Sequence, residues 1–495
     1  MTPLWKCVPL ILLLVSGLAY ARAGGGEDFA GSSSGTTGPS DAGSASPSSA
    51  VFERAGSDDG EGGGELCILG AGLAAFGLMG AMEYSKRQRT QRARASAAGR
   101  ADEDERREEA KLERPLPHDP GWSRFVAEEM GWLVVQRAYG AHSAEARTAL
   151  DRWAEPVVCK LLHKDGPWGD VVIGGLHLVE RTHGEEGGRE QLEFSVELVR
   201  AGPSGGFWAR ESWFFERPEG VRSPSLQIVQ ALGCPNCGSP SLPDANDRCP
   251  ACDRTTADGA AGWRASLRVV REEKPRAIRV DPGRRVFLTP WTLREPGYGV
   301  GTVRDPSLDE ERAAWQKRHP NESEADVEAR ARTVFLRVQD AWDRGAWLST
   351  RAFASDRAWF TLRSNLEQNR RAGVVNHVKD VSIHSCELVR VATDACYEKF
   401  TFRFRAACRD WTETTDGKTI GGSGFWPRRF SEYWTFVRTV ERPTGTRAGE
   451  GCPSCGSPLD GVDETGACGG CDAVLTTGRF EWVLARIEQA EVYGV

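Results

Sequence analysis

The sequence ESWFFER at residues 211–217 recurs as EYWTFVR at residues 432–438, and these two stretches decide the fold. In each, aromatic residues alternate with other side chains, which is typical of a half-buried β-strand. A quartet of cysteines follows each stretch, and a strand-like run beginning at Trp263 or Trp482 follows each quartet. The offset between corresponding residues stays between 218 and 221. Two copies of one domain are the simplest explanation of this self-similarity.

The order of elements is easiest to read in the second copy. Ser323 and Asp326 form a helix-start box, and apolar residues follow at helical spacing up to Trp342. A second helix is expected over 356–371 because Gly373 ends it. The first copy is expected to begin in the same way, with helices over 122–139 and 144–162.

After the helices, the apolar period changes to two. Strands are expected over 374–391, through Phe400, Phe402 and Phe404, over 430–438 and over 480–487, with a hairpin turn at Asp416-Gly417. In the first copy the strands begin at Val171. Helices followed by antiparallel strands predict an α+β fold, with the helices lying in the concavity of a curved sheet.

The two cysteine quartets predict two zinc ribbons, each inserted between the last two strands of its copy. Their spacings are C-x2-C-x11-C-x2-C and C-x2-C-x12-C-x2-C, and each C-x2-C pair can turn two thiolates toward one tetrahedral ion. Four thiolates leave no open coordination position, so we expect two structural zinc ions. The expected ligands are Cys234, Cys237, Cys249 and Cys252 in the ribbon over 234–252, and Cys452, Cys455, Cys468 and Cys471 in the ribbon over 452–471.

Disulfides are the alternative use of cysteine, but this part of the chain is expected to face a reducing cytoplasm. The other six cysteines show no ligand spacing and are expected to be buried thiols: Cys7, Cys67, Cys159, Cys386, Cys396 and Cys408.

The N-terminal part contains two apolar segments. Residues 1–23 have the basic start, apolar centre and small residues of a signal peptide, with an uncleaved anchor as the alternative. Residues 24–65 are rich in Gly and Ser and predict a disordered linker. Residues 66–82 carry no charge and are followed by a basic cluster, which predicts a transmembrane helix with the rest of the chain in the cytoplasm. A charged stalk is expected over 83–118.

Residues 70–75 of this segment also match the dinucleotide fingerprint G-x-G-x-x-A. That fingerprint needs a strand before it and an acidic strand end about 20 residues later. Here a Gly/Glu-rich stretch precedes it and basic residues follow, which favours the membrane interpretation.

Charge and motif content exclude several functions. The 495 residues include 63 Lys and Arg against 70 Asp and Glu, and this formal net charge of −7 argues against a nucleic-acid coat. The second ribbon has no Lys or Arg and the first has only Arg248, which is fewer cations than nucleic acid requires. There is no P-loop or H-E-x-x-H motif. His377, Asp380 and His384 are the candidates for acid–base chemistry, although such residues are also common at exposed strand positions.

Three stretches of the second copy resemble bacterial proteins with a Tim44-like domain: GFWPRRFSEYWTFVR at 424–438, CPSCGSPL at 452–459 and FEWVLARI at 480–487. The resemblance covers about 325–495, and residues 121–272 look like a more divergent copy without the PRRFS segment. The cysteine insert is similar to that of bacterial members and is not part of the mitochondrial domain's pattern.

The resemblance implies a fold similar to nuclear transport factor 2, with a cone-shaped apolar pocket between helices and sheet. In mitochondria the family's domain is associated with binding of anionic lipid at the inner membrane and with tethering of the import chaperone. The chaperone-recruiting helices lie outside that domain and have no match in the stalk. Membrane-surface attachment is therefore carried over, and a role in an import motor is not.

Together, these features predict Tim44-like domains over 119–272 and 323–495, joined by a linker over 273–322. We expect a single-pass protein of the bacterial inner membrane whose soluble domains are cytoplasmic and bind lipid, an apolar ligand or a protein partner without catalysis. The alternative is an enzyme that acts on a small apolar substrate in the cone-shaped pocket, with His384 or Asp380 as the base. A third possibility is a redox or zinc sensor that releases a partner when a ribbon unfolds.

Overall fold

A computed structural model describes residues 111–115, 117–165, 168, 171–183, 188–202, 205–231, 234–237, 239, 248–255, 262–276, 294–441, 451–490 and 493. All of them lie within one compact unit, Glu109–Gly494. The predicted signal peptide (1–23), linker (24–65) and transmembrane helix (66–82), and most of the predicted stalk (83–118), lie outside the described residues. Within the described ranges, no helix is both long and apolar enough to cross a membrane.

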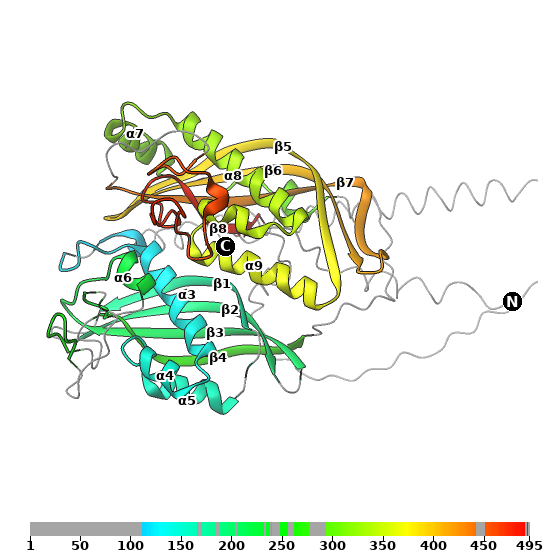
Figure 1. The fold of residues 1–495 in the computed structure, drawn as a ribbon. Helices are drawn as coiled ribbons and strands as arrows, with labels where there is room; N and C mark the ends of the chain where they lie inside the picture. The colour runs from blue at the N-terminus through cyan, green and yellow to red at the C-terminus, as the bar shows by residue number, and fades with distance from the viewer. Residues whose placement is uncertain are drawn as a thin grey trace, which may run out of the picture. The chain divides into compact units, whose positions relative to one another are not determined.

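The first half of the unit is an antiparallel sheet with strand order β1-β2-β3-β4, accompanied by helices (Figure 1). The predicted helix over 144–162 is two helices, because the helix that starts at Ala144 ends at Leu150 and Pro156 begins another. Proline is tolerated at the first position of a helix, where its missing N–H is not needed. The elements are α3 (Arg124–Gly140), α4 (Ala144–Leu150), α5 (Pro156–Asp165), β1 (Val171–His183), β2 (Arg189–Gly202), β3 (Gly205–Pro218), α6 (Leu226–Ala231) and β4 (Arg264–Arg276).

The second half repeats this plan with strand order β5-β6-β7-β8, again antiparallel (Figure 1). The predicted capping box forms, since Ser323 Oγ accepts the N–H of Asp326 and the Asp326 carboxylate accepts the N–H of Ser323. The elements are η4 (Pro296–Gly299), α7 (Leu308–Arg318), α8 (Glu324–Arg344), η5 (Trp347–Phe353), α9 (Asp356–Arg371), β5 (Val374–Thr393), β6 (Tyr397–Thr414), β7 (Thr419–Thr439), η6 (Leu459–Gly461) and β8 (Val483–Gln489).

The segment expected to be a linker, 273–322, contains regular structure. β4 runs to Arg276, and α7 lies at 308–318. Trp315 of α7 is buried in the core of the second half, where its ring lies 5.0 Å from that of Phe400. The second folded half therefore begins before residue 323, because α7 supplies part of its core.

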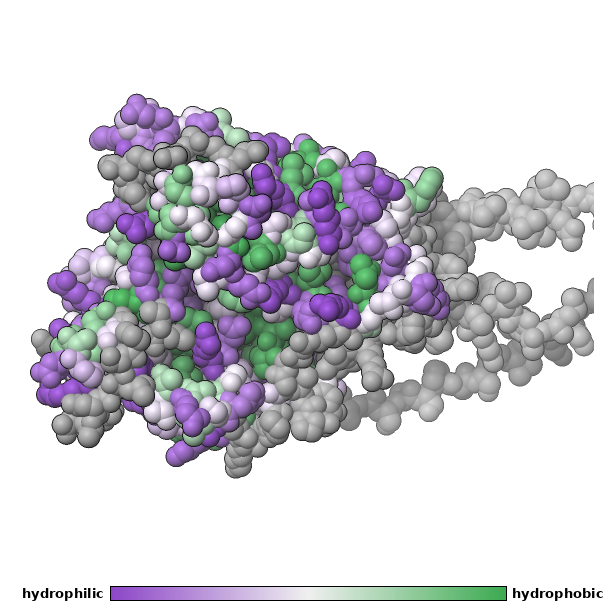
Figure 2. Space-filling view, viewed as in Figure 1, coloured by the Kyte–Doolittle hydropathy of each residue, from purple (hydrophilic) through white to green (hydrophobic). Residues whose placement is uncertain are grey.

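Aromatic side chains fill the space between α8 and the second sheet. Phe400, Phe402 and Phe404 are fully buried on one face of β6, as their alternation predicts. Phe335 of α8 stacks on Phe404 with ring centroids 4.4 Å apart, and Trp434 of β7 lies 4.8 Å from Phe335. On the face of the molecule that Figure 2 shows, hydrophilic and hydrophobic residues are mixed, and no single hydrophobic area covers it.

Corresponding positions of the two halves make the same side-chain contacts. Trp213 Nε1 donates to Glu211 at 2.8 Å, and Trp434 Nε1 donates to Glu432 at 2.9 Å. In each half a buried arginine also bonds two carboxylates, at least one of which contacts a histidine, and the arginine lies over a tryptophan ring. These sets are Arg217 with Glu190, Asp119, His118 and Trp263, and Arg438 with Glu398, Glu322, His319 and Trp482. The halves thus share strand order and an internal polar network.

Helix α3 joins the two halves. It packs on β1 of the first sheet, and its Phe125 lies 4.7 Å from Tyr397 of β6. Glu129 of α3 accepts hydrogen bonds from Ser355 Oγ and from the backbone N–H of Arg357 at the start of α9. Tyr397, Val437 and Val483 of the second half belong to the hydrophobic core of the first. The halves are thus parts of one folded body.

Candidate metal centres

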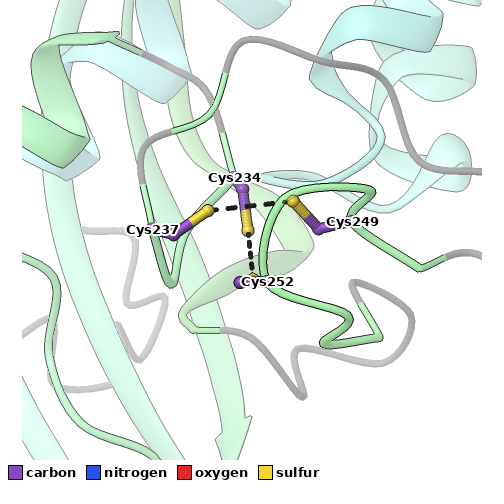
Figure 3. A group of neighbouring side chains, drawn as sticks. All are labelled: Cys234, Cys237, Cys249 and Cys252. Carbon is purple, nitrogen blue, oxygen red and sulfur yellow. Dashed lines mark hydrogen bonds between the residues drawn. The ribbon is translucent and has the colours of Figure 1, made fainter.

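Each cysteine quartet lies in the chain between the last two strands of its half, as predicted. The first follows α6 and lies between β3 and β4, and the second lies between β7 and β8. In Figure 3 the sulfurs of Cys234, Cys237, Cys249 and Cys252 point toward a common centre from two loops. Within each quartet, all four Sγ atoms lie within 4.8 Å of one another.

The distances between sulfurs fit a tetrahedral metal ion. In the first quartet Cys234–Cys252 and Cys237–Cys249 are both 3.8 Å apart. In the second, Cys452–Cys471 is 3.9 Å and Cys455–Cys468 is 3.8 Å. Zinc–thiolate bonds of about 2.3 Å give a tetrahedron whose edges are roughly 3.8 Å. The thiols are free, and a disulfide would need sulfurs about 2.05 Å apart.

The backbone of the ribbons turns the thiolates inward by the same local geometry. Asp253 N–H donates to the carbonyl of Cys249, and Asp472 N–H donates to that of Cys468, both at 2.8 Å. Both aspartates have φ near +57°, at +56° and +57°. Aspartate is among the residues that tolerate this left-handed conformation, so the two knuckles close alike.

Hydrogen bonds in the second ribbon favour ionised sulfur. The hydroxyl of Ser457 lies 3.2 Å from Cys455 Sγ, and hydrogen bonds from this side chain and the Ser457 backbone lower the pKa of the Cys455 thiol to about 6. The N–H of Gly470 points at Cys468 Sγ from 3.4 Å and lowers the pKa of Cys468, but burial and the neighbouring cysteines outweigh it and raise that pKa to about 11. A metal binds the thiolate and not the thiol, so within this quartet the contacts of Cys455 favour metal binding near neutral pH.

The two ribbons differ in how they pack. Cys452 and Cys468 are buried within the core of the second half, together with Val462 and Leu475. Among the described residues, the hydrophobic core of the first half includes none of the cysteines of the first quartet. A change in the second quartet would therefore disturb a core, whereas a change in the first would disturb mainly the loops that carry it.

Charged contacts also tie the second ribbon to neighbouring elements. Arg351 Nε of η5 donates to the carbonyl of Glu464 at 2.8 Å, and Arg363 of α9 pairs with the Glu464 carboxylate at 2.9 Å. Arg351 itself lies over the ring of Trp359. The second ribbon thus contacts both η5 and α9.

The acid–base candidates do not converge on one site. His377 stacks on Trp411 and contacts Asp343 and Glu413. Asp380, whose side chain is 67% exposed, pairs with Arg409. His384 is exposed and hydrogen-bonded to Tyr298 at 2.9 Å. Each residue thus has its own partners at or near the surface. Of the remaining cysteines, Cys159 and Cys408 are buried, Cys386 and Cys396 are half-buried, and Cys7 and Cys67 lie outside the described residues.

Comparison with known proteins bears on the second half. Residues 311–447 match a family model. That family is the Tim44-like domain. The match begins in α7, which agrees with the early start of the second half, and ends before Cys452. The Tim44-like segment therefore includes α8, α9 and three strands, while the second ribbon and β8 lie beyond it. No curated protein sequence matches the chain.

A charged cavity of about 50 Å³, which the sequence did not predict, lies between α3 and the Tim44-like segment. Glu113 is held there by Lys399, Arg124 and Arg390, and despite burial these cations keep its pKa below the usual value. The sequence does contain a feature that indicates this cavity: Arg124 and Glu128 are charged residues within the otherwise apolar stretch RFVAEEM. Each cation that lines this cavity pairs with a carboxylate; these cations are Arg124, Arg357, Arg390, Lys399 and Arg486.

Two adjacent glutamates of α3 meet one arginine in this region. Arg357 pairs with both Glu128 and Glu129 at 3.2 Å. Arg124 also pairs with Glu128, and the two arginines lower the pKa of Glu128 despite burial. Burial raises the pKa of Glu129 to about 7, although Arg357 opposes this. One carboxylate therefore keeps its charge while its neighbour titrates near neutral pH.

Proposed function

We propose that this protein is a membrane-anchored, non-catalytic scaffold on the cytoplasmic face of a bacterial inner membrane. In this proposal residues 66–82 span the membrane once, and tandem Tim44-like domains, the first of them divergent, present binding surfaces for lipid or protein partners. Each domain has a fold similar to nuclear transport factor 2 and a zinc ribbon inserted before its last strand. The two zinc ions are structural.

The main support for a scaffold rather than an enzyme is that side chains fill the core of the second half. An enzyme or lipid carrier of a cone-shaped fold needs open space between helices and sheet. Here Phe335, Phe404 and Trp434 are in mutual ring contact in that space, and all three are fully buried. Binding is therefore expected on outer surfaces, which agrees with the lack of convergence among His377, Asp380 and His384.

The metal sites support the same interpretation. Four thiolates close the coordination sphere of each ion, so no position is left for a substrate. The second ribbon packs into a core, which is the position of a stabilising element.

Fractionation of the full chain tests this proposal. Produced in a bacterium, the chain should stay in the inner-membrane fraction after an alkaline carbonate wash, and protease added to spheroplasts should spare residues 83–495. The triple variant Leu13→Asp, Leu73→Asp and Phe76→Asp, termed the anchor-free chain below, should become soluble because charged groups are costly in the bilayer. The matched control Ala74→Leu with Gly77→Leu should stay in the membrane. A wild-type chain released by carbonate would overturn the anchor, and turnover of a small substrate would overturn the scaffold.

A further inference from the structure

Two adjacent aromatic residues project from the second sheet into solvent. Phe425 is 75% exposed and Trp426 is 55% exposed, which makes them the most exposed large hydrophobic side chains among the described residues. Their rings meet edge to face with centroids 4.9 Å apart. Neither ring belongs to a hydrophobic core of the described chain. The fold itself gains little from this pair.

A bulge in β7 holds the pair outward. Cys408 pairs with Arg428 and Asp410 pairs with Ser423, so residues 424–427 lie opposite Arg409 alone. Such bulges re-aim side chains and are built features of a sheet. Gly422 makes this bulge possible, because its φ is +72° and a Cβ there would lie 2.1 Å from the carbonyl oxygen of Asp410.

Local hydrogen bonds fix the backbone of the bulge. Ser423 Oγ accepts the N–H groups of Phe425 at 3.1 Å and Trp426 at 2.8 Å. Arg409 Nη1 donates to the carbonyl of Gly424 at 3.0 Å, and Pro427 fixes the next φ. The pair is therefore presented on a preorganised turn, and little conformational entropy remains to be lost on binding.

Cationic side chains lie near the pair. Arg429 is exposed three residues after Trp426, and exposed Lys379 lies opposite Arg409 on the neighbouring strand. The carboxylate of Asp380, which follows Lys379, is paired with Arg409. Aromatic rings with cations beside them are favoured where hydrocarbon meets headgroups.

The short segment between residues 66–82 and the folded body keeps the folded body close to such an interface. Residues 83–110, which number 28, connect the apolar segment to Lys111. They reach about 42 Å as a helix and at most roughly 100 Å when extended. The folded body therefore stays within reach of the bilayer that holds residues 66–82.

We propose that Phe425 and Trp426 form a second membrane contact, in which both rings insert into the interfacial layer of the bilayer. This inference rests on the proposed membrane anchoring and adds the surface by which the folded body lies against the membrane. A protein groove is the other class of occupant, and the experiment below distinguishes it.

Vesicle partitioning of the anchor-free chain tests the contact separately from the anchor. The anchor-free chain is mixed with vesicles of phosphatidylethanolamine and phosphatidylglycerol, and its partition coefficient is measured by flotation. Adding Phe425→Ser and Trp426→Ser should lower this coefficient at least about tenfold, since two rings lose their burial. The matched pair Leu336→Ser with Leu348→Ser removes two hydrophobic side chains that are 42% and 45% exposed, and should leave the coefficient within about twofold.

The outcomes separate the two proposals. Unchanged partitioning of the Phe425/Trp426 variant, an equal loss in the Leu336/Leu348 control, or no binding by the anchor-free chain overturns the membrane contact. In each of these cases the intact chain can still stay in the membrane fraction after a carbonate wash, so the proposed anchor is unaffected. A variant that binds vesicles normally but loses a copurifying protein assigns the rings to that protein and also overturns the proposal. The Phe425→Ser/Trp426→Ser variant must keep the zinc content and melting temperature of the anchor-free chain, because both rings lie outside the core.

Discussion

The guanidinium of Arg438 lies over the ring of Trp482, with its carbon 4.4 Å from the ring centroid. Arg438 precedes the second ribbon and Trp482 follows it, so this contact closes the base of the insertion. Arg217 and Trp263 make the same contact around the first ribbon, at 4.1 Å. A guanidinium over a desolvated indole contributes about 2 kcal/mol. In each half the contact joins the candidate metal centre to the sheet.

Removing the buried arginine at this position should be costly. In Arg438→Met the carboxylates of Glu398 and Glu322 lose the guanidinium. Glu398 is fully buried and keeps only its contacts with His319, Arg318 and Trp315. Breaking a buried ion pair by removing one partner costs up to about 3–5 kcal/mol of unfolding free energy. Urea unfolding measures the loss. Arg344→Met, whose side chain is 68% exposed and pairs with Asp340, should change stability by less than about 0.5 kcal/mol. Similar losses in the two variants would contradict the role of the buried network.

Metal removal should affect the two halves unequally. Cys468→Ser should lower the melting temperature more than Cys249→Ser, because Cys468 belongs to a hydrophobic core and Cys249 does not. Both cysteines are 1% exposed, so the pair is matched in burial. Each variant should retain one zinc ion per chain by elemental analysis. Equal melting temperatures would show that the packing of the second ribbon adds no stability.

Close packing inside the second ribbon predicts a glycine requirement. A Cβ at Gly469 would lie 2.7 Å from the carbonyl oxygen of Gly461, which is too close without a backbone shift. Gly469→Ala should therefore weaken zinc retention during competition with a chelator, by about tenfold or more. Gly461→Ala is the control, since a Cβ there meets nothing within 4 Å. Equal retention by the two variants would disprove the close contact.

Glu129 should make stability depend on pH. Its pKa is 4.5 in the unfolded chain and about 7 in the folded one, so the folded state binds the additional proton between these values. Stability should then fall as pH rises from about 4.5 to 7, by up to about 3 kcal/mol. Glu129→Gln should lack this decline and gain stability relative to wild type toward pH 7. Its surroundings include Arg357, Asp356 and Ser355.

Glu128→Gln is the matched control for that measurement. Arg124 and Arg357 lower the pKa of Glu128, so its charge contributes stability above about pH 4.5 that is lost as pH falls through the lowered value. The glutamine variant should therefore be less stable than wild type at pH 7. If Glu129→Gln also loses stability relative to wild type as pH rises, Arg357 keeps both carboxylates ionised.

Local signals predicted the second half well. The Ser323–Asp326 box and Gly373 fix the starts and ends of helices by hydrogen bonds and backbone conformation within a few residues, and α9 has the predicted bounds. The cysteine spacings likewise identified both quartets, because ligand geometry is encoded within each C-x2-C pair.

Long-range packing could not be predicted in this way. Helix α3 is buried along most of its length, including Glu128 and Glu129, so it has no polar stripe to reveal its partners. Arg357, which pairs with both glutamates, lies more than 220 residues away in the sequence. The same holds for α7, whose polar composition suggested a linker although Trp315 is buried.

The hydrogen bonds that Glu129 accepts from the start of α9 also limit how the chain can be divided. A fragment beginning at residue 323 would lack the carboxylate at that helix and would expose Tyr397, Val437 and Val483 to water. Two halves that share a strand order have thus become mutually dependent. The second half completes the hydrophobic interior of the first, so the first half cannot be removed without exposing apolar side chains of the second.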